Sequence, residues 1–173
     1  MFLVEDAVDI KYIKENLNDL WAGTIFEGYR YLDNKQKGEF GERYVERGMK
    51  KNHDIQPSKY NNAGHDRIID KIPTEIKFSL AHSDHKKGII KDNCWTMNHV
   101  AEGKDWERLI FVGINSDPKN PVIKWMTKND FISLKSKYFN PQQGGNSADN
   151  DDWMTASRKL FELTKEMRDI SEW

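Results

Sequence analysis

Apolar side chains recur at helical spacing in three separate segments of the chain. The first predicts a helix over 4–21, where intervals of three and four residues separate Ile10, Ile13, Leu17 and Leu20. A second helix is predicted over 38–51. A final helix is predicted over 153–172, where the same intervals separate Trp153, Ala156, Leu160, Leu163, Met167 and Ile170.

Strand patterns lie between these helices. "RLIFVGIN" (108–115) is a continuous run of apolar, β-branched and aromatic residues, which is typical of a strand covered on both faces. "PVIKWMT" (121–127) is expected to be its neighbour in the sheet, because the turn residues of "SDPKN" connect the two runs. After it, Asn129 or Asp130 is expected to cap a short helix over "FISLKSK".

The order of these segments predicts an α/β or α+β domain, in which a mixed central sheet of about four or five strands is flanked by helices. A chain of 173 residues is long enough to form one domain, 1–173, with its own core. Segment 139–152, "FNPQQGGNSADNDD", breaks the pattern with Asn, Gln, Gly and Asp, and is expected to be a mobile loop.

A hairpin is predicted at 65–80, "HDRIIDKIPTEIKFSL", where apolar and charged residues alternate. A tight turn at 71–72 would pair position 66 with 77 and position 68 with 75. Because side chains alternate with a period of two, Asp66, Glu75 and Lys77 would then share one face. The opposite face is expected to pack on a helix through Ile76, Phe78 and Leu80.

Two carboxylates and an ammonium on one face indicate chemistry. Neighbouring carboxylates repel each other unless a cation lies between them, and Mg²⁺, or Mn²⁺ in its place, prefers such oxygen ligands. The expected metal ligands are Asp66, Glu75 and the carbonyl oxygen of Ile76. Lys77 is placed to orient or deprotonate a water molecule or to hold a phosphate, so the set suits phosphodiester hydrolysis. The alternative is a solvated Glu-x-Lys pair that contributes little.

At these residues the chain resembles a known family. "GHDRIID…TEIKFSL" is similar to the signature of the PD-(D/E)xK nuclease superfamily, in which an acidic residue precedes Glu/Asp-x-Lys across a β-hairpin. The resemblance implies a restriction-endonuclease-like core, with Asp66 and Glu75 as metal ligands and Lys77 as the catalytic lysine. His65 stands where the superfamily usually has proline. A Gly-x-x-x-Glu on the preceding helix implies a catalytic role for Glu42 in "GEFGE", although Glu42 also fits a solvated helix face.

Within the superfamily, the small type II restriction endonucleases are the most similar members. In the PvuII-like ones, a Glu-Leu-Lys strand is followed, after a polar connection, by a stretch with His and Asn that reads bases. Here "CWTMNHV" (94–100) occupies that place. The resemblance therefore implies that Asn98 and His99 contact base edges.

Other polar residues are candidates for contacts with DNA. A basic stretch beyond the hairpin is expected to contact phosphates, or else to form a solvated surface: His82, His85, Lys86, Lys87 and Lys91. Base reading needs side chains such as Asn, Gln and His that reach a groove edge. The candidates are Asn98, His99, Gln142, Gln143 and Asn146, of which the last three lie in a loop whose alternative is disorder.

Composition limits the possible classes of protein. The net charge of −1, from 27 basic and 28 acidic residues, gives no argument for bulk nucleic-acid binding. The single cysteine, Cys94, excludes a disulfide framework and suits a reducing compartment. "MFLVEDAVD" lacks the basic region of a signal peptide, and no apolar run is long enough to span a membrane. The sequence contains no glycine-rich phosphate-binding loop, so no nucleotide cofactor is expected. A cytoplasmic protein of prokaryotic or phage origin is expected.

The sequence thus predicts a sequence-specific, Mg²⁺-dependent endonuclease that hydrolyses phosphodiester bonds in double-stranded DNA, of the type II restriction kind. A homing, repair-nicking or resolvase enzyme remains open within the same class. A small enzyme that cuts both strands of a palindrome is expected to be a homodimer. The helix at 4–21 or the apolar stripe of 153–170 would form the contact, unless each packs on its own sheet. The rival prediction is a non-catalytic DNA- or protein-binding module with a nuclease-like fold.

Overall fold

The computed structural model describes residue 11 and residues 17–58, 64–142 and 152–173. Its helical elements are η1 (Tyr29–Tyr31), α3 (Asn34–Met49), α4 (Lys128–Tyr138), α5 (Ser157–Glu166) and η2 (Ile170–Glu172). Its strands are β1 (Ile55–Pro57), β2 (Arg67–Ile69), β3 (Ile72–Leu80), β4 (Ser83–Asp84), β5 (Ile89–Ile90), β6 (Thr96–Ala101), β7 (Arg108–Ile114), β8 (Val122–Thr127), β9 (Asn140–Pro141), β10 (Asp152–Ala156) and β11 (Arg168–Asp169).

A six-stranded mixed sheet forms the centre of the fold, in the order β1-β2-β3-β7-β8-β11. The β3 and β7 strands are parallel, and the other neighbouring pairs are antiparallel. The predicted α+β class with a mixed central sheet is confirmed, and the sheet has one strand more than the upper expectation. The extra pairing comes from β1 and β11, which are only three and two residues long and carry no recognisable strand pattern.

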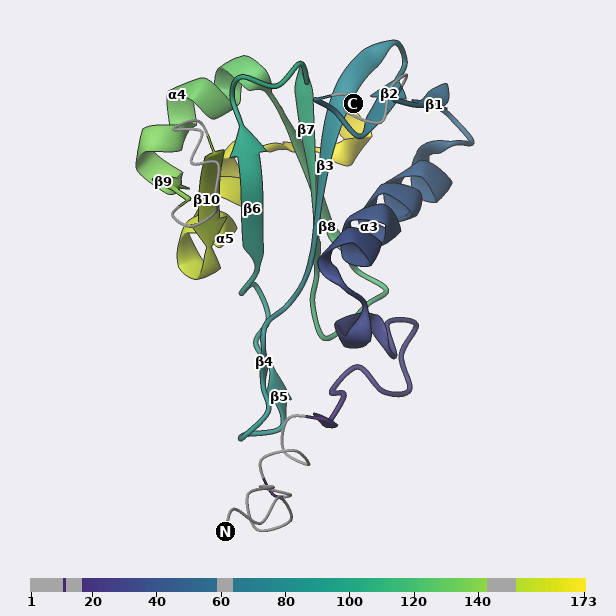
Figure 1. Ribbon diagram of the computed structural model, residues 1–173, viewed down its shortest axis with the longest axis vertical. Coiled ribbons are helices and arrows are strands. Elements are labelled where there is room, and N and C mark those ends of the chain that lie inside the picture. Colours follow the sequence, from purple (N-terminus) through teal and green to yellow (C-terminus); the bar gives the residue numbers. More distant parts are fainter. Residues whose placement is uncertain (1–10, 12–16, 59–63, 143–151) are drawn as a thin grey trace, which may run out of the picture.

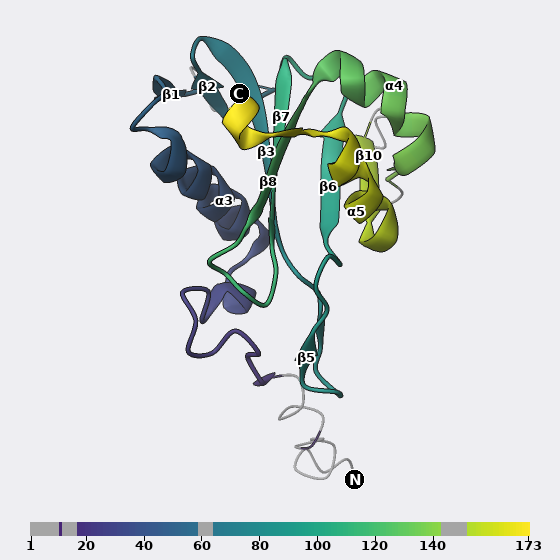
Figure 2. The same ribbon diagram turned by 180° about the vertical axis from the view of Figure 1, so that it is seen from behind.

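Two layers cover the sheet. Figure 1 shows α3 on one side of β3 and β7, and α4, α5 and β6 on the other, and the view from behind agrees (Figure 2). The β6, β10 and β9 strands form a second, three-stranded sheet within that second layer. As predicted, β7 is covered on both faces, and every residue from Leu109 to Ile114 is buried.

The packing of α3 against β3 depends on Gly41. A Cβ atom at this position would lie 2.5 Å from Cβ of Phe78, so only glycine lets the helix approach so closely. Phe78 is in turn surrounded by the aromatic rings of Phe26, Tyr29, Phe40 and Tyr44. The predicted packing of the Phe78 face on a helix is therefore confirmed.

The helix predicted over 38–51 begins four residues earlier than expected, at Asn34. Asp33 caps it: its carboxylate accepts from the backbone N–H of Gln36, whose side chain accepts from the N–H of Asp33. This capping box adds a polar first turn that hydrophobic periodicity does not reveal.

The predicted helix over 4–21 falls mostly outside the described residues, but its last residues contradict the prediction. Residues 11 and 17 are helical, as predicted, but residues 18 and 19 lie in no regular element and residues 20 and 21 form a turn. The carboxylate of Asp19 accepts hydrogen bonds from the backbone N–H groups of Trp21 and Gly28, at 3.0 and 2.8 Å. A side chain that competes for backbone donors in this way favours a turn over a helix.

The hairpin forms, but its turn lies one residue earlier than predicted. Asp70 and Lys71 occupy the turn with φ values of 51° and 69°, and Ile69 pairs with Ile72. Two consecutive residues with positive φ match the right-handed twist of a two-residue hairpin. The observed register pairs position 67 with 74 and position 68 with 73 rather than 75, a shift of two residues that would set position 66 against 75. Because the shift is two residues, the face on which Asp66 lies is unchanged.

The helix predicted over 153–172 is wrong in its extent. Residues 152–156 form β10, helix α5 spans only Ser157–Glu166, and β11 and η2 follow. Leu160, Leu163 and Met167 are buried, so the apolar stripe packs on its own core rather than on another chain. Antiparallel pairing with β6 extends residues 152–156, because a neighbouring strand satisfies their backbone groups.

Smaller corrections concern caps and loops. Thr127 caps α4, and Asp130 is the third residue of its capping box, so neither Asn129 nor Asp130 is the cap. The polar connection after β3 contains a short hairpin of β4 and β5. The ends of segment 139–152 belong to β9 and β10, and residues 143–151 lie outside the described part of the chain.

None of the helices in the described residues is both long enough and apolar enough to cross a lipid bilayer.

The contact between α3 and β3 gives a prediction on stability. Alanine at an exposed helical glycine stabilises by about 1 kcal/mol, whereas overpacking a tight contact costs about 1–3 kcal/mol. Gly41→Ala is therefore expected to lower the free energy of unfolding by about 1–3 kcal/mol relative to Gly48→Ala. Gly48 is the matched control, because a Cβ there meets nothing within 4 Å. Urea unfolding of both variants checks this, and equal midpoints would contradict it.

Candidate active site

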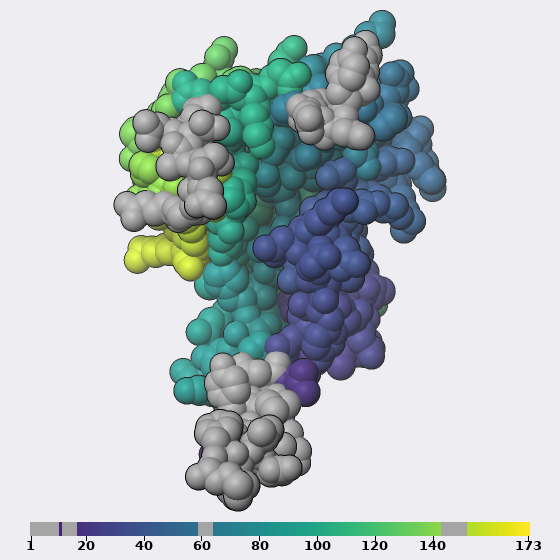
Figure 3. Space-filling model, viewed as in Figure 1, coloured from purple at the N-terminus to yellow at the C-terminus, as the bar shows by residue number. Residues whose placement is uncertain are grey.

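A cleft of about 590 Å³ lies between the two layers. Its floor is the second half of β3, and α3 and β6 contribute the walls (Figure 3). The residues of these three elements that line it are Asn34, Lys37, Gly38, Glu42, Ile76, Lys77, Phe78, Ser79, Leu80, Thr96, Met97, Asn98 and His99.

The cleft exists because β3 is longer than its partner β2. Only Ile72, Pro73 and Thr74 pair with β2, whereas β7 pairs with β3 from Thr74 to Leu80. The second half of β3 is therefore held in the sheet on one side, and its other edge opens into the cleft. Asp66 lies where β2 leaves this edge, and its backbone N–H donates to the carbonyl of Thr74 at 3.0 Å.

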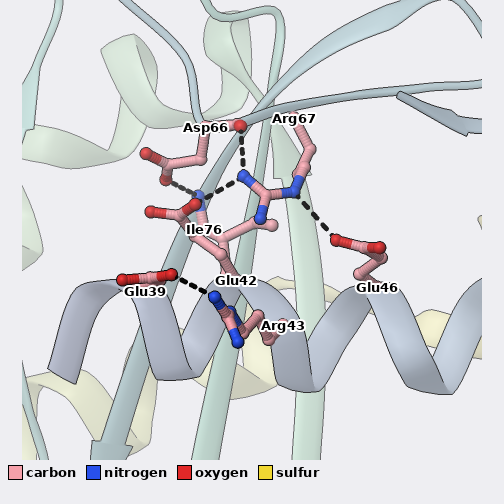
Figure 4. Close-up of polar contacts among 7 residues, drawn as sticks. All are labelled: Glu39, Glu42, Arg43, Glu46, Asp66, Arg67 and Ile76. Atoms are coloured by element: carbon pink, nitrogen blue, oxygen red, sulfur yellow. Dashed lines mark hydrogen bonds and ion pairs between the residues drawn. The ribbon is translucent and has the colours of Figure 1, made fainter. Parts of the chain in front are cut away.

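Asp66 is fixed on the open edge of β3 by the backbone. Its Oδ2 accepts a hydrogen bond from the N–H of Ile76 at 2.7 Å (Figure 4). In an extended strand the N–H and C=O groups of one residue point to the same edge, so the Ile76 carbonyl also faces the Asp66 side. The carboxylate and the carbonyl that the sequence predicts as metal ligands thus lie at one edge.

Glu75 and Lys77 form an ion pair on β3, with 2.7 Å between Oε1 and Nζ. The side chain of Glu75 is 4% exposed and that of Lys77 is 19% exposed. The pair is thus not the solvated surface pair that a lone Glu-x-Lys would suggest. A carboxylate removed from water needs such a partner, because an isolated buried charge is costly.

The negative charges of the carboxylates at this site repel each other. Burial raises the pKa of Glu75, Lys77 lowers it, and repulsion by Asp66 raises it further. Burial also raises the pKa of Asp66, against the Ile76 N–H and the charge of Lys77. In both cases the ammonium of Lys104 is a further charge that favours the ionised form. The net excess of negative charge at a buried site is the condition that a divalent cation relieves.

Glu42 reaches the site from α3, but its carboxylate is already paired. Arg67 donates through Nη1 to Glu42 and to the carbonyl of Asp66, and through Nε to Glu46 (Figure 4). Burial raises the pKa of Glu42, and Arg67 lowers it. The predicted catalytic role of Glu42 stays a prediction, and it requires Glu42 to share its charge with Arg67.

The donors present suit a hard metal ion. Among the residues that the structure describes, no three His, Cys, Asp or Glu side chains are grouped so as to hold a metal. Two carboxylates and one backbone carbonyl supply oxygen atoms alone, which is the set that Mg²⁺ takes together with water and substrate oxygens. The geometry therefore fits the predicted ligands Asp66, Glu75 and Ile76, and their role in metal binding stays a prediction.

The predicted DNA-contacting residues divide into those in the cleft and those outside it. His85, Asn98 and His99 line the cleft. His99 is held in place there: its Nδ1 lies 2.7 Å from the carboxylate of Asp152, and its backbone N–H donates to Gln142. Gln142 thus meets His99 although 43 residues separate them in sequence.

The remaining predicted contacts lie elsewhere. Lys86 and Lys87 are exposed in the β4–β5 hairpin, and Lys91 pairs with Asp84 at 3.3 Å. The imidazole of His82 lies 2.7 Å from the hydroxyl of Thr96, so it serves an internal contact. Gln143 and Asn146 lie outside the described residues.

Two cations of the cleft were not predicted from the sequence, Arg30 and Lys37. Lys37 lies on α3 five residues before Glu42, and the true start of this helix at Asn34 would have placed it on the wall. Arg30 belongs to the short η1 element, whose position no sequence pattern indicates.

No protein-family model matches the chain, and no curated protein matches it. One similar solved structure is that of a bacterial homing endonuclease, with 13% sequence identity and a TM-score of 0.41, covering 78% of this chain and 92% of that chain. A likeness of this size identifies neither the fold nor the function of the chain.

The buried carboxylates predict a pH-dependent stability of the metal-free protein. Because the pKa of Glu75 is raised on folding despite Lys77, ionised Glu75 opposes folding at pH values above that raised pKa. This cost disappears as the pH falls to the ordinary value of 4.5. Glu75→Gln is therefore expected to be more stable than the parent protein at about pH 8 and to lose that advantage at about pH 4.

Urea unfolding at both pH values measures this difference. Glu162→Gln is the matched control, because Glu162 forms an exposed pair with Lys165 on α5. Such pairs contribute only about 0–1 kcal/mol. A Glu75→Gln protein that is less stable than the parent at about pH 8 would show that the ion pair outweighs burial.

Proposed function

We propose that this chain is a metal-dependent endonuclease that hydrolyses phosphodiester bonds of double-stranded DNA. The observation that carries the proposal is that Asp66 and Lys77 both line the cleft beside β3, where Lys77 is paired with the buried carboxylate of Glu75. A structural ion pair needs one carboxylate for one ammonium. Here a second, half-buried carboxylate, that of Asp66, acts on the pair: it raises the pKa of Glu75 and forms no ion pair of its own among the described residues.

Each side chain has a distinct task in this proposal. Asp66, Glu75 and the carbonyl of Ile76 would hold Mg²⁺, which would neutralise the carboxylates and lower the pKa of a water molecule. Lys77 points its ammonium at Glu75 in the free protein and would turn to the attacking water or the scissile phosphate when DNA is bound. The backbone N–H of Ile76 holds Asp66 in one orientation, so this ligand is positioned before DNA arrives.

The surroundings of the cleft favour DNA of defined sequence over bulk nucleic acid. Its lining includes Arg30, Lys37 and His85, which would contact phosphates, and Asn98 and His99, which carry donors and acceptors for base edges. The net charge of −1 gives little non-specific attraction. We therefore propose a sequence-specific enzyme of the type II restriction kind, with homing, repair-nicking and resolvase enzymes as alternatives in the same class.

A two-fold dimer is part of the proposal, because a chain with one site cuts one strand at a time and a palindromic cut needs two sites. The apolar stripe of α5 is buried in its own chain, so it does not supply the contact. Exposed apolar side chains near the N-terminal segment are better candidates: Leu17, Ile25 and Tyr31.

The rival proposal is a module that binds DNA without cutting it. The ion pair between Glu75 and Lys77 favours the non-cutting module in one respect, because the two charges already neutralise each other without a metal. The presence of two carboxylates, those of Asp66 and Glu75, argues against a non-cutting module, since a binding surface for phosphates gains nothing from negative charge removed from water.

Incubation with plasmid DNA and Mg²⁺ distinguishes the two. The parent protein is expected to give discrete fragments, and Asp66→Asn is expected to give none, because it removes a metal ligand while keeping the acceptor for Ile76. Asp117→Asn serves as the control, since Asp117 is exposed in the turn between β7 and β8, outside the lining of the cleft. Binding of the parent protein to DNA fragments without any cleavage, at every Mg²⁺ and Mn²⁺ concentration tested, would support the rival module.

Lys77→Ala is expected to slow single-turnover cleavage by about 10²-fold to 10³-fold or more, because its ammonium acts on charge that develops in the transition state. DNA binding in Ca²⁺ should weaken only modestly, since one phosphate contact among several is lost. Lys165→Ala on α5 is the control. If affinity collapses in Lys77→Ala while the cleavage rate of bound DNA stays near that of the parent, Lys77 is a binding residue.

A further inference from the structure

The connection between β6 and β7 is fastened to the start of the β2–β3 hairpin. Nδ1 of His65 lies 3.0 Å from Oδ1 of Asp105, and the N–H of Glu107 donates to the carbonyl of Pro73 at 2.8 Å. The β6–β7 connection and the β2–β3 hairpin lie at the same end of the sheet in Figures 1 and 2. The connection is thus held against the residues that lead into Asp66.

Gly64 makes this contact closer than any other residue type would allow. A Cβ atom there would lie 2.6 Å from Oδ1 of Asp105, 2.7 Å from its backbone nitrogen and 2.9 Å from Cβ of Lys104. The side chain of His65, which follows, is only 8% exposed. The backbone of the connection therefore packs directly on the segment two residues before Asp66, and Lys104 starts from this point.

The charge of Lys104 reaches both buried carboxylates of the site. Lys104 is exposed, and its ammonium favours the ionised form of Asp66 and of Glu75. Within the described residues, the Lys104 ammonium has no ion-pair partner, whereas Lys77 is paired with Glu75 at 2.7 Å. Lys77 is thus already paired, whereas Lys104 is a cation without an ion-pair partner among the described residues, and it starts beside Gly64, just outside the residues that line the cleft.

We propose that Lys104 contacts the scissile phosphate, or the phosphate next to it, and supplies a second positive charge to the reaction. The proposal rests on the nuclease function proposed above. A phosphodiester carries one negative charge, and it gains a second one as the attacking oxygen adds to phosphorus. Lys77 and Lys104 together match these two charges, while the bound cation is matched by the two carboxylates.

This role also explains why the β6–β7 connection packs on Gly64 and is hydrogen-bonded to His65. A flexible lysine gains little at a transition state, because ordering its side chain costs conformational entropy. The contacts with Gly64 and His65 restrict the backbone at Lys104, so only the torsions of its side chain remain to be ordered. Lys104 acts directly on the substrate in this proposal, whereas Gly64, His65 and Asp105 are positioning residues.

The test compares single-turnover cleavage of one oligonucleotide duplex in Mg²⁺ by four proteins: the parent, Lys104→Ala, Lys104→Arg and Lys119→Ala. Lys119 is the matched control, because it is an exposed lysine in the turn after β7 and, unlike Lys104, is not among the charges that act on Asp66 and Glu75. We expect Lys104→Ala to be slower by about 10-fold to 100-fold, less than for a fully buried donor. Lys104→Arg should stay within a few-fold of the parent, and Lys119→Ala should match it.

A second measurement separates a phosphate contact from an indirect effect on the carboxylates. In Ca²⁺, the slope of the logarithm of DNA affinity against the logarithm of salt concentration should fall by about one unit in Lys104→Ala and stay unchanged in Lys119→Ala. The Mg²⁺ concentration for half-maximal rate should also decrease in Lys104→Ala, because a cation that competes with the metal for the carboxylates is lost.

The outcomes are distinct. If the parent protein cleaves and Lys104→Ala matches Lys119→Ala in rate and in salt slope, the role of Lys104 is overturned and the nuclease function stands. If the rate falls but the salt slope does not change, Lys104 acts through Asp66 and Glu75, and the phosphate contact is overturned. If the parent protein does not cleave at all, the nuclease function fails and the role of Lys104 fails with it.

Discussion

The unequal pairing of the two edges of β3 is the constraint on which the rest of the structure depends. Parallel pairing with β7 runs from Thr74 to Leu80 and places β3 in the middle of a buried sheet, whereas β2 pairs only from Ile72 to Thr74. One edge therefore supplies rigidity, and the other exposes backbone groups to the cleft. Asp66 uses one of them, the N–H of Ile76. If β2 were longer, it would close the cleft.

This arrangement forces charged groups into the wall of a hydrophobic core. Glu75 is buried next to Leu109, its neighbour on β7, which is fully buried. Lys77 and the backbone reduce the cost of this burial but do not remove it, since the pKa values of Asp66 and Glu75 remain raised. The free-energy cost of burying these charges is compatible with folding only because the surrounding core is extensive. It includes β7 and the aromatic cluster around Phe78.

Much of the fold could be predicted because its elements carry local patterns. The continuous apolar run of β7 and the alternation of β3 are local, and both were located correctly. The C-terminal segment was not, although its apolar stripe is equally regular. Leu160 and Leu163 do lie on a helix, but residues 152–156 pair with β6, a strand more than fifty residues away in sequence. Helical periodicity does not reveal a partner of that kind, which overrides the local preference.

The sequence by itself determined that Glu75 and Lys77 share one face of β3, because side-chain alternation along a strand fixes their relation, and that Asp66 lies on the other strand of the same hairpin. Only the tertiary structure decided what surrounds these residues. It pairs Glu42 with Arg67, joins His99 to Gln142, and brings Lys104 to the start of the hairpin. These contacts join segments 25 to 43 residues apart, and their geometry depends on how whole elements pack, which no local pattern encodes.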